Sequence, residues 1–317
     1  MKIDQTRVAI IGAGYMGGGI AQTLVMGGAQ CVLIDRDSSS AEAGYTRVID
    51  QAADFERKGY FEPGSAARVA ERLSWSGNLA EAVADADLIF EVVFENFDVK
   101  TAVLTEIERY ARAGAIIASN TSAIPIGDMA AVLAKPERFF GIHWFNPAQL
   151  LPGIEIIPGA ASDPSLVAGL VELLTAAGKE PAVVPDTPGF VCNRLQFALF
   201  KEAALMVEEG HVSAEQIDIV VKASFGFRLA LYGPFAVADM AGLDVYANSY
   251  DTLARELGER FTVPNSLRER VENGDYGIKT GGGYLGLTEH QSAKLVEGRD
   301  KAYVELGRLR RELAKVD

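Results

Sequence analysis

The stretch RVAIIGAGYMGGGIAQTLVMGG, residues 7–28, is the strongest indication of the fold class. It begins with an apolar run typical of a buried strand and continues with the spacing of a helix. Between them, Gly12, Gly14 and Gly17 form the pattern GxGxxG. In this context the glycines allow a tight turn, the approach of a pyrophosphate to the backbone, and close packing of helix on strand. Although a plain strand–helix turn could also use glycines, the stretch favours a dinucleotide-binding domain whose helix N-terminus binds the phosphates.

The next apolar run indicates which dinucleotide is bound. The run CVLID ends at Asp35, 23 residues after Gly12. A carboxylate here accepts hydrogen bonds from the ribose hydroxyls of NAD and repels the 2′-phosphate of NADP. Arg36 leaves NADP as the alternative, because a nearby arginine can bind that phosphate, but we favour NAD. Tyr15 and Met16, inside the glycine turn, are also expected cofactor contacts.

Short apolar runs alternate with helical stretches through roughly the first 185 residues. Most are rich in Ile, Val and Phe without clean alternation, which is typical of strands covered on both faces and therefore of a mainly parallel sheet between helices. The runs occupy residues 7–12, 31–35, 72–75, 87–93, 115–119, 139–144, 153–159 and 181–185. They predict a Rossmann-type, NAD-binding α/β domain over residues 1–186.

Helical spacing dominates the rest of the chain. Thr187 is a suitable N-cap and Pro188 a suitable first residue for a helix that extends to Gly210. Ser213 and Gln216 have the spacing of a capping box for the next helix. The remaining segments also have helical spacing, including a charged helix at 289–316. The sequence therefore predicts an all-helical C-terminal domain over residues 187–317.

Composition and charge narrow the class of partner. The 317-residue chain has a net charge of −13 and no run approaching eighteen apolar residues. We therefore expect neither nucleic acid nor a membrane as partner, and a small-molecule substrate instead. The only cysteines, Cys31 and Cys192, have no metal-ligand spacing and are interpreted as small buried hydrophobic residues. A cytoplasmic protein without a metal centre is expected.

Two predicted core strands each contain one polar residue. FFGIHW contains His143, and GIEIIPG contains Glu155 twelve positions later. A lone histidine in an apolar run is more often a core residue with satisfied hydrogen bonds. The turn between these runs is short, however, and if the strands are neighbours the two side chains can meet. A carboxylate on one ring nitrogen fixes the tautomer and raises the basicity of the other nitrogen, as a general base requires.

Other polar residues follow predicted strands at the same edge of the sheet. In SNTSAIP, Asn120 is an expected cofactor contact, and Ser122 either binds a substrate oxygen or caps a helix. Asn193 lies near the start of the helical half, where a polar residue in an apolar helix usually caps or bridges. Asn146 is most simply a turn residue before Pro147.

Together these motifs resemble the 3-hydroxyacyl-CoA dehydrogenase family over residues 7 to about 287. The matching segments are IIGAGYMGGGIA, FENFDVK, ASNTSAIP, GIHWFNP, IEIIPG, DTPGFVCNRL, GPFAVADMAGLD and GIKTGGGYL, in family order and spacing. The resemblance implies an NAD-dependent oxidoreductase in which His143 and Glu155 take the proton of a substrate hydroxyl while hydride passes to NAD. It also implies fatty acid metabolism as the setting and a homodimer formed through the helical half.

The resemblance assigns further roles by matched position. Ser122 and Asn193 are the residues that hold substrate oxygens, and Asn146 belongs to the histidine motif as a substrate contact. Glu95 and Lys100 are further NAD contacts. All four residues of the expected catalytic set (His143, Glu155, Ser122, Asn193) are present, which disfavours a non-catalytic, NAD-binding structural protein.

Departures from the family pattern leave the substrate open. Acyl-CoA members usually carry a lysine three positions before the catalytic glutamate, and this chain has Pro152. HWFNP, LPGIEIIPG and GIKTGGGYL look more like relatives that act without CoA: gulonate, carnitine and pyridine-aldehyde dehydrogenases. Conversely, Arg57 and Lys58 stand where acyl-CoA members carry basic residues near the CoA phosphates. A 3-hydroxyacyl-CoA-type substrate is the leading hypothesis, and a non-CoA hydroxy acid or aldehyde is the alternative.

Overall fold

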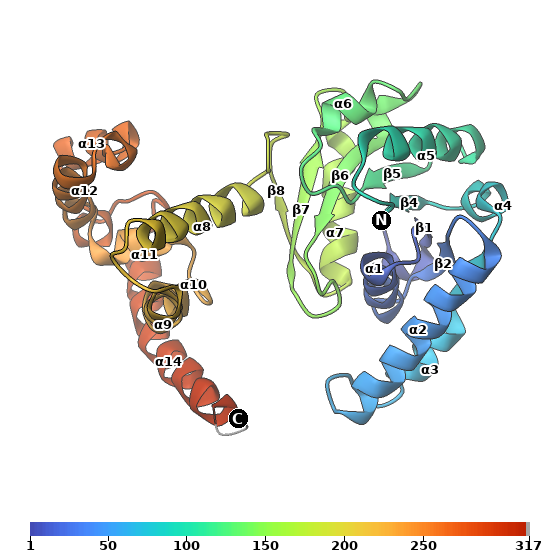
Figure 1. Ribbon diagram of the computed structural model, residues 1–317, viewed down its shortest axis with the longest axis horizontal. Coiled ribbons are helices and arrows are strands. Elements are labelled where there is room, and N and C mark those ends of the chain that lie inside the picture. Colours follow the sequence, from blue (N-terminus) through green and yellow to red (C-terminus); the bar gives the residue numbers. More distant parts are fainter. Residues whose placement is uncertain (315–317) are drawn as a thin grey trace. The chain divides into compact units, whose positions relative to one another are not determined.

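The structure is a computed structural model that describes residues 1–314 (Figure 1). The chain forms two compact units, Met1–Phe200 and the part from Lys201 onward. The first unit is a sheet between helices and the second is helical, which confirms the predicted fold class. Helix α8, Cys192–Glu208, runs across the point where the units divide.

The first unit is built on one eight-stranded sheet with the order β3-β2-β1-β4-β5-β6-β7-β8. Neighbouring strands are parallel except β6 and β7, so the prediction of a mainly parallel sheet is confirmed. The strands are β1 Arg7–Ile11, β2 Gln30–Ile34, β3 Leu73–Ser76, β4 Leu88–Glu91, β5 Ile116–Ser119, β6 Phe139–Trp144, β7 Gly153–Pro158 and β8 Glu180–Val183.

Helices cover both faces of this sheet and create two hydrophobic cores (Figure 1). Because successive side chains of a strand point to opposite faces, Val8 and Ile10 enter one core while Ala9 and Ile11 enter the other. The helices are α1 Tyr15–Met26, α2 Ser38–Arg57, α3 Ser65–Arg72, α4 Leu79–Ala84, α5 Phe97–Tyr110, α6 Ile126–Ala130 and α7 Val167–Ala176, with 3₁₀ turns at Ile3–Gln5, Pro136–Arg138 and Pro164–Leu166.

The antiparallel pair β6–β7 places two predicted site residues opposite each other. Its connection, residues 145–152, is too short for the crossover that a parallel pair requires. The register pairs His143 with Glu155, as the sequence predicted for neighbouring strands. The Lys179 ammonium donates to the Ala148 carbonyl at 2.5 Å and to the Leu151 carbonyl at 2.7 Å, which holds the connection in place.

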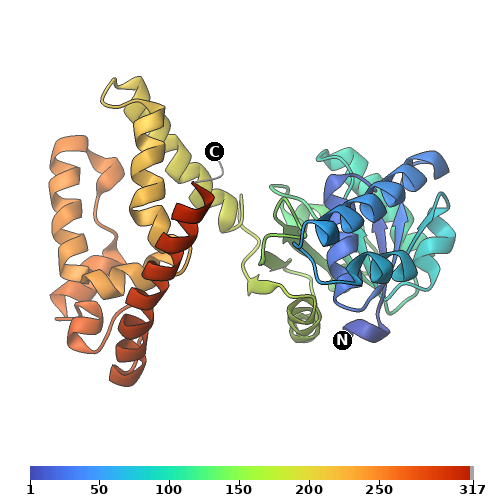
Figure 2. The same cartoon turned by 90° about the horizontal axis from the view of Figure 1, so that it is seen from below.

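The second unit has a small core, formed by Ala238, Leu243, Val263 and Leu267. Buried Asp239 accepts hydrogen bonds from the backbone N–H groups of Tyr284 and Leu285, which ties the loop GIKTGGGYL to α11. The long helix α14 lies along the other helices of this unit (Figure 2). The elements are α9 Ala214–Ala223, α10 Phe225–Leu229, α11 Pro234–Ala241, α12 Leu243–Leu257, α13 Asn265–Glu272 and α14 Glu289–Leu313, with 3₁₀ turns at Glu259–Phe261 and Gly277–Thr280.

The start of α8 corrects the sequence prediction. Thr187 and Pro188 do not begin the helix, which starts at Cys192. Gly189 and Phe190 have φ of 74° and 49°, and two successive residues in this left-handed region cannot open a helix. The Phe190 ring, however, is only 1% exposed. Burial of an aromatic ring contributes about 1.5–3 kcal/mol, which offsets the roughly 1–2 kcal/mol cost of the left-handed backbone.

Three local predictions have separate outcomes. Ser213 is the N-cap of α9, since its side chain accepts a hydrogen bond from the Gln216 N–H.

Cys31 is buried as expected, but Cys192 is partly exposed at the start of α8, so its interpretation as a buried hydrophobic residue is wrong. None of the helices within residues 1–314 combines the length and apolar composition needed to cross a bilayer.

Candidate active site

A buried histidine–carboxylate pair lies at the centre of the candidate site. Nδ1 of His143 is 2.9 Å from Oε2 of Glu155, and each residue is 4% exposed. The other carboxylate oxygen accepts backbone hydrogen bonds from Val191 at 3.0 Å and Cys192 at 2.9 Å. Burial raises the pKa of Glu155, but the hydrogen bonds from His143, Cys192 and Val191 outweigh it, so the pKa lies below its usual range.

The ionised carboxylate determines the tautomer of the histidine. A carboxylate only accepts hydrogen bonds, so Nδ1 of His143 is the donor and Nε2 of the neutral ring is the free acceptor. Two aromatic rings, Phe145 at a centroid distance of 4.8 Å and Phe190 at 5.7 Å, pack against the imidazole. The ring is therefore held in one orientation with a basic nitrogen available for proton transfer.

Ser122 and Asn193 are also brought together, although they are far apart in the sequence. The side-chain amide of Asn193 donates to the Ser122 carbonyl at 2.8 Å. Ser122 lies in the loop after β5, and its side chain is exposed. Residues 191 and 192 donate to Glu155, and Asn193 donates to Ser122. The start of α8 therefore connects the His143–Glu155 pair with the Ser122 loop.

The glycine turn borders a cleft of about 1070 Å³. Gly12 has φ of 111°, and a Cβ there would lie 2.5 Å from the Val92 carbonyl oxygen. A Cβ on Gly17 would lie 1.8 Å from the Gly12 oxygen, so both glycines are required by packing. A Cβ on Gly14 would meet only open space. The lining residues include Ile11, Gly12, Gly14, Ile34, Asp35, Arg36, Asn78, Val92, Val93 and Phe94.

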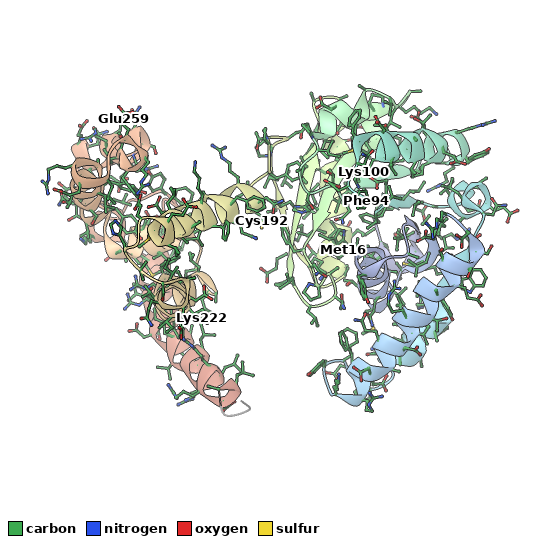
Figure 3. All side chains as sticks on the ribbon, in the orientation of Figure 1. Met16, Phe94, Lys100, Cys192, Lys222 and Glu259 are labelled. Atoms are coloured by element: carbon green, nitrogen blue, oxygen red, sulfur yellow. The ribbon has the colours of Figure 1, made fainter. Side chains whose placement is uncertain are left out.

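This cleft fits the dinucleotide that the sequence predicts. Gly14 leaves the backbone open to a pyrophosphate at the start of α1. The Asp35 carboxylate accepts the Ala13 N–H at 2.8 Å and lines the cleft at the end of β2. The Arg36 guanidinium is exposed and lies 3.3 Å from Asp37, a carboxylate that would oppose a 2′-phosphate. Tyr15, which is 80% exposed, and Met16 are the first two residues of α1 (Figure 3).

Two predicted asparagines have different surroundings. Asn120 accepts the Trp144 N–H on its side-chain oxygen at 2.8 Å, so it connects the end of β5 with the end of β6. Asn146 is exposed in the β6–β7 connection and precedes a cis peptide bond to Pro147. Asn120 therefore helps to align the strands that end at the site.

Lys100 belongs to a buried network that sequence reasoning missed. Its side chain is 1% exposed, and its ammonium donates to Glu91 at 2.9 Å and to the Val93 carbonyl at 3.2 Å (Figure 3). The same ammonium lies 3.2 Å from Glu95. Glu91 is fully buried and also accepts the Ser119 hydroxyl at 2.6 Å. The available signal was a carboxylate at the end of an apolar strand, followed nine positions later by a lysine in the next helix.

Glu95 connects this network to the Ser122 loop. One of its oxygens accepts hydrogen bonds from the Thr121 hydroxyl at 2.6 Å and from the Ser122 N–H at 2.9 Å. Burial raises the pKa of Glu95, but the Thr121 hydrogen bond and the Lys100 charge outweigh it, and the pKa falls below its usual range. Among residues 1–314, no group of three His, Cys, Asp or Glu side chains is placed to hold a metal ion.

A glycine-rich nucleotide turn after the first strand and a buried histidine–carboxylate pair in the same sheet point to the class of NAD-dependent dehydrogenases. Residues 7–187 match the family description "3-hydroxyacyl-CoA dehydrogenase, NAD binding domain", and residues 189–286 match "3-hydroxyacyl-CoA dehydrogenase, C-terminal domain". The chain belongs to the 3-hydroxyacyl-CoA dehydrogenase family. It is an enzyme that uses NAD and acts on hydroxyl groups.

Similar proteins include members with different substrates. The chain is 35% identical to a 5-formyl-3-hydroxy-2-methylpyridine 4-carboxylate 5-dehydrogenase of Mesorhizobium japonicum, over 95% of this chain and 97% of the relative. It is 36% identical to a probable 3-hydroxybutyryl-CoA dehydrogenase of Bacillus subtilis, over 92% and 100%. A crystal structure of a 3-hydroxyacyl-CoA dehydrogenase from Archaeoglobus fulgidus has a TM-score of 0.81 and 32% identity, and the match covers 96% and 99%.

Proposed function

We propose that this NAD-dependent dehydrogenase interconverts a 3-hydroxyacyl group and its 3-oxo form, with His143 as the base and Glu155 as its orienting carboxylate. The observation that supports the proposal is the 2.9 Å contact between Nδ1 of His143 and an ionised Glu155. In the oxidative direction, free Nε2 of His143 accepts the hydroxyl proton, and the Glu155 charge stabilises the imidazolium that forms. When bound, NAD would supply the hydride acceptor for the carbon that carries the substrate hydroxyl.

Ser122 and Asn193 are proposed to hold the substrate oxygens. The Ser122 hydroxyl is exposed, and Asn193 uses one of its two amide protons on the Ser122 carbonyl, which leaves one amide proton available. These donors would stabilise charge that develops on the substrate oxygen during hydride transfer. Asn146 is proposed to contact the substrate from the β6–β7 connection.

The cofactor contacts are proposed to follow the glycine turn and the next strand. The N–H groups at Gly14, Tyr15 and Met16 would bind the pyrophosphate, with Gly12 and Gly17 shaping the turn. Asp35 would bind the ribose hydroxyls, with Arg36 beside it at the rim, and Asn120 and Glu95 would border the nicotinamide end. The resemblance adds a homodimer, a cytoplasmic location and, for an acyl-CoA substrate, a role in fatty acid metabolism.

The second candidate is the same reaction on a hydroxy acid or aldehyde without CoA. A specific observation favours it: Asp54 forms ion pairs with both Arg57 and Lys58, the latter at 2.6 Å. Arg57 and Lys58 are the basic residues that would bind the phosphates of CoA. Both already form an ion pair with the same carboxylate, Asp54, which would compete with the phosphates. The Mesorhizobium relative is named for a pyridine carboxylate substrate. Pro152, which replaces a lysine, supports the same candidate.

A substrate panel separates the two candidates. Wild-type enzyme is assayed with NADH and acetoacetyl-CoA, and with NAD and a set of free 3-hydroxy acids, sugar acids and hydroxymethyl pyridine carboxylates. The proposal predicts a kcat/KM for acetoacetyl-CoA at least tenfold above that of any free acid. The reverse order would establish the second candidate, and absence of turnover on every compound would contradict both.

A further inference from the structure

Arg47 lies beside the glycine turn but belongs to a different element, helix α2. Gly44 and Arg47 are three positions apart in that helix, so both face the turn. A Cβ on Gly44 would lie 2.5 Å from the Cβ of Ala13, which shows how closely α2 packs against the turn. The Arg47 guanidinium donates to the Ala13 carbonyl. Helix α2 therefore brings a positive charge to the residue between the first two glycines of the turn.

Two further contacts place this guanidinium beside α1. Its central carbon lies 4.9 Å from the centroid of the Tyr15 ring, a distance typical of a cation–π contact. A Cβ on Gly18, three positions further along α1, would lie 3.9 Å from one of the guanidinium nitrogens. The charge is therefore held against the first turn of α1.

The charge of Arg47 is not neutralised by a carboxylate of the protein. Its contact at Ala13 is with a neutral carbonyl, and among residues 1–314 it forms no ion pair, unlike Arg57 and Lys58 of the same helix. The side chain is partly buried, so water screens its charge less than it screens an exposed one. In a chain of net charge −13, an unpaired cation at this place suits an anionic ligand.

We propose that Arg47 supplies positive charge to the diphosphate of NAD and so raises the affinity of this chain for its cofactor. The proposal rests on the proposed place of the diphosphate at residues 14–16, and not on the identity of the substrate. The N–H groups at the start of a helix carry only partial positive charge, whereas each phosphate of the diphosphate carries a full negative charge. Arg47 adds a full positive charge beside those N–H groups.

Asp35 and Arg47 hold the Ala13 backbone from its two ends. The Asp35 carboxylate accepts the Ala13 N–H at 2.8 Å and lines the part of the cleft proposed for the ribose. The Arg47 guanidinium donates to the carbonyl of the same residue. The carboxylate thus serves the hydroxyl groups of the cofactor, and the guanidinium serves its phosphates.

The test compares three replacements of Arg47 by the Kd for NADH, from fluorescence titration at low salt. Arg47→Met removes the charge, Arg47→Gln removes the charge but keeps a donor for the Ala13 carbonyl, and Arg47→Lys keeps the charge. We expect the Kd to rise about tenfold in the first two variants and less than about threefold in the third. Arg255→Met, at an arginine whose side chain is 70% exposed in the second unit, is the matched control and should keep the wild-type Kd.

Salt and cofactor fragments distinguish an electrostatic effect from a loss of structure. Salt screens charges, so between about 0.05 M and about 1 M NaCl the tenfold difference between Arg47→Met and wild type should shrink to less than about threefold. ADP-ribose, which contains the diphosphate, should lose the same factor as NADH in competition experiments, whereas adenosine should lose none. Arg47→Gln, which can still donate to Ala13, serves if Arg47→Met does not fold.

Three results would overturn the proposal. The first is a Kd for NADH within about twofold of wild type in both neutral variants. The second is an Arg47→Lys variant that binds NADH as weakly as Arg47→Met. The third is an equal loss of affinity for adenosine and for ADP-ribose, because adenosine lacks the diphosphate.

These readouts also separate the proposal from the proposed function. Binding of NADH and ADP-ribose needs no turnover, so it tests Arg47 even if no compound of the substrate panel reacts. If wild type binds adenosine as tightly as ADP-ribose, the proposed place of the diphosphate fails, and the role of Arg47 fails with it. If wild type prefers ADP-ribose and the neutral Arg47 variants keep that preference in full, the role of Arg47 alone is overturned.

Discussion

Glu155 is the residue on which the proposed chemistry of the site depends. Its carboxylate accepts three hydrogen bonds, one from the His143 ring and two from the backbone of residues 191 and 192. Only an ionised carboxylate can accept all three without donating. One side chain thus fixes the histidine tautomer and the backbone before α8.

Replacement of Glu155 by glutamine should remove most of the turnover. The two backbone donors need the amide oxygen, which turns the amide NH₂ toward Nδ1 of His143. Nδ1 then becomes an acceptor and the ring proton moves to Nε2, so the base is in the wrong tautomer. A fall in kcat of about 10²–10⁴-fold is expected, with an unchanged Kd for NADH. Glu172→Gln, at an exposed carboxylate, is the control, and near-wild-type turnover of Glu155→Gln would contradict the base assignment.

The same carboxylate predicts a pH dependence of stability. Its pKa is lowered in the folded protein, so the unfolded chain binds the proton more readily as the pH falls. The stability that Glu155 contributes is complete above its unfolded pKa, near 4.5, and is lost as the pH falls through the lower folded value. Wild type should exceed Glu155→Gln in free energy of unfolding by about 1–3 kcal/mol at pH 7. Urea denaturation at pH 7 and below pH 4 should show this difference shrinking, and a constant difference would contradict the ionised pair.

At the residue scale, the sequence predicts the pair His143 and Glu155 but not all of the buried charged residues that hold the surrounding loops in place. His143 and Glu155 could be identified because each interrupts an apolar run near a short turn. The buried Lys179 could not be identified, because whether a charged side chain is buried depends on partners that folding brings from elsewhere in the chain. Lys179, for example, donates to carbonyls 28 and 31 positions away.

At the element scale, the glycines of the turn before α1 have separable roles. Gly17 is confined by the Gly12 carbonyl, whereas Gly14 faces open space. The first requirement comes from packing within the fold. The requirement for glycine at position 14 arises only when a ligand approaches the backbone there.

Alanine substitutions should separate these roles. Gly14→Ala should fold with a Tm within about 2 °C of wild type but bind NADH at least about tenfold more weakly, because its methyl group meets the pyrophosphate. Gly17→Ala should lower the Tm by several degrees, because a Cβ would lie 1.8 Å from the Gly12 carbonyl oxygen. Thermal unfolding and NADH titration measure both effects. Equal losses of NADH affinity and of Tm in the two variants would contradict the division.

The start of α8 shows where element prediction from local signals fails. Thr187 and Pro188 satisfy the local rules for a helix start, but the chain first turns through Gly189 and Phe190. This turn is required by a tertiary contact, because it buries the Phe190 ring beside His143. The strands of the sheet can be predicted, because runs of residues buried on both faces of a sheet are recognisable from their composition.

At the scale of the whole molecule, the second unit leaves much apolar surface uncovered. Helices α9 and α10 contain no buried residue, and Ile219, Val220 and Leu229 are exposed. Exposed apolar side chains in such numbers favour association with another chain.

We therefore predict a homodimer in solution. Size-exclusion chromatography with light scattering should give a mass of twice 34.0 kDa. The mass should not change on dilution through the micromolar range, because apolar interfaces of obligate dimers are large. A mass of 34.0 kDa at all concentrations would contradict the prediction.

The β6–β7 pair also separates what can vary in this chain from what cannot. Strands β5 and β8 flank the pair, and burial of its apolar side chains specifies the register that sets His143 opposite Glu155. Within residues 145–152, Phe145 packs against the imidazole, whereas Asn146, Leu150 and Leu151 are exposed, so we expect replacements at these three positions to leave the proposed base pair in place. Substrate preference could therefore change at these exposed positions while the proposed acid–base pair is inherited unaltered.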